Sequence, residues 1–222
     1  MGIQIIGNGG TLVGAGEEAS LPMHAARHPL TGNWYRYSGF TGTIGAALAA
    51  DSEVFQFRFL SGAKSFALVY KVALEGIGIV AVATAGGPMG FSLIPARAWT
   101  AAGSGGTRIA VSGDNLQTET ALANSQVNDM GIATTGALTA GTKTLDANAQ
   151  GGILWSQGTG AVTTYQQIVQ GVQNIFDADG EGQQPLVLAN QEGFVIRTSH
   201  TGVAALTYVA RFRVIWAEVT AF

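Results

Sequence analysis

Cysteine is absent from this sequence of 222 residues, which excludes a disulfide framework and a thiolate metal site. Charge is scarce as well: Asp, Glu, Lys and Arg make up 11% of the chain, about half of the ~25% usual for soluble domains. The 11 Lys and Arg residues are spread singly. Phosphate binding requires grouped cations, so nucleic acid is not expected as the main partner. A free monomer needs surface charge to stay dispersed. The deficit therefore indicates either a surface covered by other chains or one rich in Ser, Thr, Asn and Gln.

One stretch without a charged residue runs from Gly76 to Ala96, which is long enough for a membrane helix. Gly86-Gly87-Pro88 lies at its centre and would break a helix there. Two strands around this turn, 78–83 and 91–99, are the better prediction, and no membrane partner is expected. Residues 1–16 carry no Lys or Arg before an apolar stretch, so a signal peptide is not expected either.

Hydrophobic residues and glycine are both abundant. The chain is 47% hydrophobic and contains 32 glycines, which argues against disorder and indicates many tight turns between strands. Turn signals recur between short strand-like segments and long helical patterns are few, as in a β-sandwich. We therefore predict an all-β, jelly-roll-like β-sandwich over residues 34–222, preceded by an irregular N-terminal arm (1–33), with at most short helices.

One strand pattern is especially regular. In Val54–Phe59, Phe55, Phe57 and Phe59 share one face while Gln56 and Arg58 take the other, which predicts a half-buried strand. Further strands are expected at 65–74, 108–111, 132–134, 138–145, 185–188, 194–197 and 206–219. Short helices are expected at 22–27 and 166–176, a helix or a loop at 116–127, and an exposed loop at 147–160.

No catalytic constellation emerges, and we assign no catalytic, cofactor-binding or metal residues. His24 and His28 have the i,i+4 spacing of a helical metal site, but no carboxylate follows at the metalloprotease spacing. Gly14–Ala19 matches the loose dinucleotide fingerprint without the strand and helix that it requires. Asp177–Glu181 resembles the start of a calcium loop whose other ligands are missing. Like Asp114-Asn115, it is better explained as a turn.

Aromatic residues offer one further candidate site. Trp155 lies in a Gly-rich segment, and Tyr35 and Tyr37 lie close together in sequence. Aromatic faces of this kind stack on sugar rings, although such residues more commonly lie in a core or an interface.

The C-terminal third resembles the ending of a family of tailed-phage virion structural proteins. The residues that carry the resemblance are Leu186–Arg197, Thr201-Gly202 and Val214–Phe222, with earlier blocks at Ala50–Arg58, Ala96–Trp99, Gly105–Thr107 and Ala137–Asp146. The resemblance spans about residues 32–222, and 1–31 and 147–184 match poorly. It implies a virion component; some small β-rich head proteins of this kind are decoration or cement proteins, commonly trimers, and it brings no catalytic residues.

Sequence and resemblance together favour a non-enzymatic decoration protein on the outer surface of a phage capsid. Its expected partners are the major capsid protein and further copies of itself in a homotrimer. The alternatives are a receptor- or glycan-binding head or tail protein of the same fold, which predicts exposed aromatics such as Trp155, and a tail or neck component. A polysaccharide depolymerase, which would need paired carboxylates in a cleft, ranks last.

Overall fold

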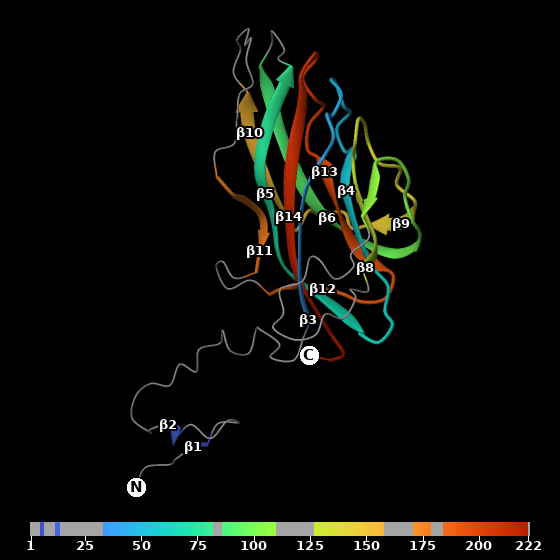
Figure 1. Ribbon diagram of the computed structural model, residues 1–222, viewed down its shortest axis with the longest axis vertical. Helices are drawn as coiled ribbons and strands as arrows, with labels where there is room; N and C mark the ends of the chain where they lie inside the picture. The colour runs from blue at the N-terminus through green and yellow to red at the C-terminus, as the bar shows by residue number, and fades with distance from the viewer. Residues whose placement is uncertain are drawn as a thin grey trace. The chain divides into compact units, whose positions relative to one another are not determined.

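The computed structural model describes residues 5–6, 12–13, 33–81, 86–109, 127–157, 171–178 and 184–221 (Figure 1). The chain divides into two compact units, Met1–Leu30 and Thr31–Phe222. In the first unit, β1 (Ile5–Ile6) pairs antiparallel with β2 (Leu12–Val13). The other described strands belong to the second unit.

Two antiparallel sheets build the second unit. The seven-stranded sheet has the order β10-β6-β13-β4-β8-β7, with β9 pairing β6, and the five-stranded sheet has the order β11-β5-β14-β3, with β12 pairing β5. The strands of the first sheet are β10 (Gly151–Gln157), β6 (Gly87–Ala101), β13 (Glu192–Thr198), β4 (Glu53–Phe59), β8 (Val127–Ile132), β7 (Thr107–Ile109) and β9 (Thr142–Leu145). Those of the second are β11 (Gln173–Asp177), β5 (Phe66–Ala81), β14 (Thr207–Val219), β3 (Asn33–Phe40) and β12 (Leu186–Leu188). The all-β sandwich is confirmed, whereas the jelly-roll connectivity stays a prediction.

Aromatic rings fill the space between the sheets. Phe57 on β4 meets the Trp216 ring on β14 edge-on at 5.1 Å between centroids, and Phe91 on β6 meets Phe212 in the same way at 5.1 Å. All four side chains are at most 1% exposed. The predicted alternation of the phenylalanines in β4 is thereby confirmed.

The charge-free stretch forms strands, but not the pair of short strands predicted. Residues 78–81 are the end of the 16-residue strand β5, and β6 already begins at Gly87. The two strands lie in different sheets and do not pair, so the Gly-Gly-Pro segment is not a hairpin turn. In the described part of the chain, no helix is long and apolar enough to cross a membrane.

Two further predictions are wrong. The helix expected at 166–176 is strand β11 over its described part, with a bulge between Asn174 and Phe176. This bulge allows the neighbouring residues Ile175 and Phe176 both to be buried, which imitates helical spacing in sequence. The loop expected at 147–160 contains strand β10, in which Ile153 and Trp155 are half-buried and Leu154 is exposed. The expected segment 22–27 and residues 116–126 lie outside the described residues.

Replacing Phe57 tests the aromatic core. Phe57→Ala removes a fully buried ring from between Phe194 and Trp216, and we expect the free energy of unfolding to fall by about 3–5 kcal/mol. Leu154→Ala, at a side chain that is 64% exposed, is the control and should change it by no more than about 0.5 kcal/mol. Urea unfolding measures both, and equal effects would contradict this packing.

Tyr37 makes stability sensitive to alkaline pH. Burial raises the pKa of Tyr37 from 10.0 to about 12, and burial also raises the pKa of Tyr208. The unfolded chain therefore loses its Tyr37 proton first, so stability should decline as pH rises from about 10 to about 12. Tyr37→Phe should reduce that decline by about 1–3 kcal/mol, measured by urea unfolding at several pH values. An unchanged decline would contradict the assignment.

Candidate functional site: a polar cluster buried over β4

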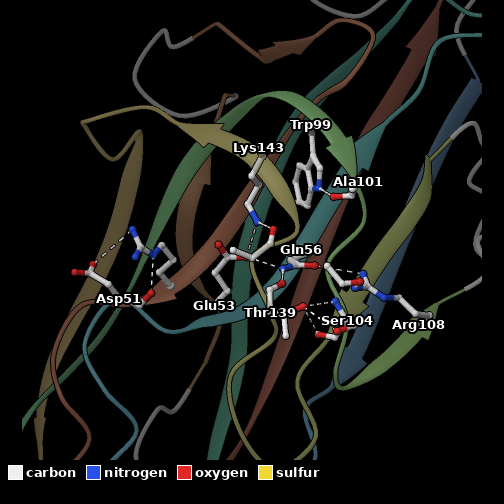
Figure 2. A network of polar contacts seen from close by, with 12 residues as sticks. Asp51, Glu53, Gln56, Trp99, Ala101, Ser104, Arg108, Thr139 and Lys143 are labelled. Atoms are coloured by element: carbon white, nitrogen blue, oxygen red, sulfur yellow. Dashed lines mark hydrogen bonds and ion pairs between the residues drawn. The ribbon is translucent and has the colours of Figure 1, made fainter.

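The face of β4 that points away from the five-stranded sheet is covered by other parts of the same chain (Figure 2). The segment after β6 and the segment between β8 and β9 lie over it and hold each other, because the Thr139 amide donates to the Ser104 carbonyl at 2.9 Å. The Leu138 amide donates to the Glu53 carbonyl at 2.8 Å. Gln56, predicted to face solvent, is fully buried, so the prediction of a half-buried strand is wrong at this position.

A β-bulge determines which side chains enter this covered face. Phe55 pairs with Ile196 and Glu53 with Arg197, which leaves Val54 as an extra residue in β4. Simple alternation would place Glu53 on the face opposite Gln56. The extra residue reverses the alternation, and the Glu53 carboxylate accepts a hydrogen bond from Gln56 Nε2 at 2.6 Å.

Glu53 and Lys143 form a buried ion pair. Lys143 on β9 lies with its Nζ 2.9 Å from Glu53 Oε2, and the two side chains are 1% and 7% exposed. Lys143 Nζ also donates to the Ala140 carbonyl and lies 4.4 Å from the centre of the Trp99 ring. Salt bridge, hydrogen bond and cation–π contact together compensate the desolvation of the ammonium group.

The Gln56 carboxamide is held on all sides. Its Nε2 donates to Glu53 and, at 2.7 Å, to the Thr139 carbonyl, and its Oε1 accepts from Arg108 Nη1 at 3.3 Å. A Cβ on Gly103 would lie 2.5 Å from Oε1 and 2.7 Å from Nε2, so only glycine allows the backbone to lie against this amide. We call Glu53, Gln56, Arg108, Thr139 and Lys143 the β4 polar cluster.

Charges on the surface of the described body are largely paired with one another. Arg97 binds Asp146 at 2.9 Å and Glu192 at 2.8 Å, and the hydrogen bond that Arg97 donates to Asp146 is the main cause that raises the pKa of Arg97. On the five-stranded sheet, Glu75 forms salt bridges with Arg211 at 2.9 Å and with Arg213 at 3.1 Å. Within the described ranges, no group of His, Asp or Glu side chains has the arrangement of a metal site.

The candidate residues from the sequence do not assemble into a site. His24, His28, Gly14–Ala19 and Asp114 lie outside the described residues. Asp177 is the last residue of β11, and its carboxylate forms a salt bridge with Lys71 Nζ at 2.8 Å.

The aromatic candidates are packed inward. Tyr35 and Tyr37 are core residues. Trp155 is half-buried, with its ring centroid 5.5 Å from that of Phe91. The prediction that Trp155 is an exposed loop residue is therefore wrong.

A small cavity lies between β6 and β14. Its volume is about 10 Å³ and its lining includes Met89, Thr198, His200 and Tyr208. This is about the space for one water molecule, so the cavity does not admit an organic substrate.

Comparison with known proteins finds no family model, no curated protein and no solved structure that matches this chain. The structure brings together three of the sequence blocks on which the expected resemblance was based. Glu53 and Gln56 come from the block 50–58, Trp99 from 96–99, and Thr139 and Lys143 from 137–146, and all of these lie in or against the β4 polar cluster (Figure 2). These blocks therefore encode one local structure.

Removing one member of the buried ion pair tests its contribution. Lys143→Met leaves Glu53 in the same covered position, and we expect a loss of about 3–5 kcal/mol in the free energy of unfolding. Arg97→Met, in an ion-pair network where the arginine is 57% exposed, is the matched control and should cost about 1 kcal/mol or less. Urea unfolding at neutral pH measures both, and a Lys143 variant as stable as the Arg97 variant would contradict the buried pair.

Proposed function

We propose that this chain is a non-enzymatic structural component of a phage virion: a decoration or cement protein on the outer surface of the capsid that binds the major capsid protein, as a homotrimer. The observation that carries the proposal is that the few charged side chains are paired with one another within the chain. The chain is 11% charged, and the described body ties its acids into internal pairs such as Glu53–Lys143 and Asp146–Arg97.

The surface left by this pairing suits contact with other protein chains. Phe40 on β3 is 60% exposed and Leu154 on β10 is 64% exposed. Apolar and small side chains can be covered by a neighbour without the desolvation cost that charged groups carry. A protein that binds only the assembled shell stabilises that shell by mass action, and many weakly bound copies act together.

The alternative, a receptor- or glycan-binding head or tail protein, requires an exposed aromatic platform. Among the large apolar side chains that are exposed in the described residues, Phe40 is the one aromatic ring. Trp155, the residue on which that alternative was built, is half-buried against Phe91.

Copy number per particle tests the proposal. We expect quantitative mass spectrometry of purified virions to find this protein in a simple stoichiometric ratio to the major capsid protein, because a cement protein occupies repeated capsid joints. The control is a known single-vertex component of the same particles. A copy number matching that component would move the protein to the tail or neck, and absence from virions would refute the structural proposal.

A further inference from the structure

The β4 polar cluster contains the parts required to form an amide bond between two side chains. An amine, Lys143 Nζ, and a carboxamide, Gln56, are both hydrogen-bonded to the same carboxylate oxygen, Glu53 Oε2, at 2.9 Å and 2.6 Å. All three side chains are buried. We propose that Lys143 and Gln56 form an intramolecular isopeptide bond, with Glu53 as the proton-transfer group and the ion pair described above as the state before the reaction.

The proposed reaction is a transamidation that balances without an external reagent. Glu53 takes a proton from the Lys143 ammonium group, and the resulting amine attacks Cδ of Gln56. The Nζ–Cδ bond forms, the Cδ–Nε2 bond breaks, and Glu53 returns the proton to the leaving nitrogen. The products are a secondary amide and ammonia, which leaves as ammonium with the second proton. No atom is oxidised or reduced.

The hydrogen bonds around Gln56 assign a role to each neighbour. Its Nε2 donates to Glu53, which places the leaving nitrogen on the group that must protonate it. Its Oε1 accepts from Arg108 Nη1 at 3.3 Å, so a cation faces the oxygen on which negative charge develops during attack. The orientation of the amide follows from its partners, since two acceptors surround Nε2 and a donor faces Oε1.

Burial supplies the remaining requirement. The Trp99 ring, itself fully buried, lies 4.4 Å from Lys143 Nζ, and Gly103 lets the backbone lie against the Gln56 amide. Amine and amide are thus held together where bulk water does not compete, which gives an intramolecular reaction a high effective concentration. Ammonia released into dilute solution drives the exchange of one amide for another.

The intact mass of the purified full-length protein tests the proposal. We expect the denatured wild-type chain to weigh less than its sequence by one ammonia, and Lys143→Arg and Glu53→Gln to have the full mass of their sequences. Lys71→Arg, at the partly exposed partner of Asp177, is the matched control and should keep the deficit. A wild-type chain of full mass overturns the proposal, whether or not any variant folds.

Tryptic peptides distinguish the cross-link from other losses of ammonia. Asn8-Gly9 can lose ammonia by forming a succinimide, and a deficit that persists in Lys143→Arg would be of that kind and would overturn the proposal. The cross-linked protein should instead yield residues 37–58 joined to residues 109–197, because trypsin does not cleave after an acylated lysine. Separate peptides 109–143 and 144–197 in full yield would contradict the bond.

Discussion

Strand β4 is covered on both faces, and much of the described body follows from that constraint. One face meets the aromatic rings of the five-stranded sheet, and the other meets segments of its own chain that return after β6 and β8. Polar groups buried in this way must satisfy one another, since an unpaired buried charge costs several kcal/mol. The Glu53–Lys143 pair, the three hydrogen bonds of the Gln56 side chain and the close approach of Gly103 are one solution to that requirement.

Each of the two sheets has an acidic residue at or beside a β-bulge. The extra residue Val54 in β4 turns Glu53 toward Lys143. In β5 the register against β14 shifts between Arg211 and Phe212, which leaves Glu75 as the extra residue, and Glu75 receives both Arg211 and Arg213. In β4 an acid that strict alternation would place elsewhere thereby reaches a cation on another strand, and in β5 the acid at the bulge reaches two.

The covering of β4 and the bulges also explain which features of the structure the sequence predicts and which it does not. The alternation of Phe55, Phe57 and Phe59 and of the last strand predicts the sandwich, because a strand with one apolar face needs a second layer.

The candidate site could not be predicted in this way. Gln56 has the pattern of a solvent-facing residue, and nothing local to it indicates that residues 133–146 return to cover it. The position of Glu53 depends on a bulge, and β10 was missed because its glycines and serines resemble a loop. The one sequence signal near the site is the set of blocks at 50–58, 96–99 and 137–146, and it indicates a resemblance rather than a chemistry.

The pairing of charged side chains with one another and the scarcity of charge on the surface have the same physical consequence. A surface whose cations are held by its own carboxylates, as Arg97 is by Asp146 and Glu192, presents little that must be desolvated when another chain covers it. The same chain places Glu53 and Lys143 inside, where they join β4 to β9 across segments distant in sequence. Contacts of that kind must break before the covering segments can leave β4, so they act on the rate of unfolding as well as on its equilibrium. In the virion role proposed above, the protein is held in a shell under load, and a cluster that joins β4 to its cover slows its unfolding there.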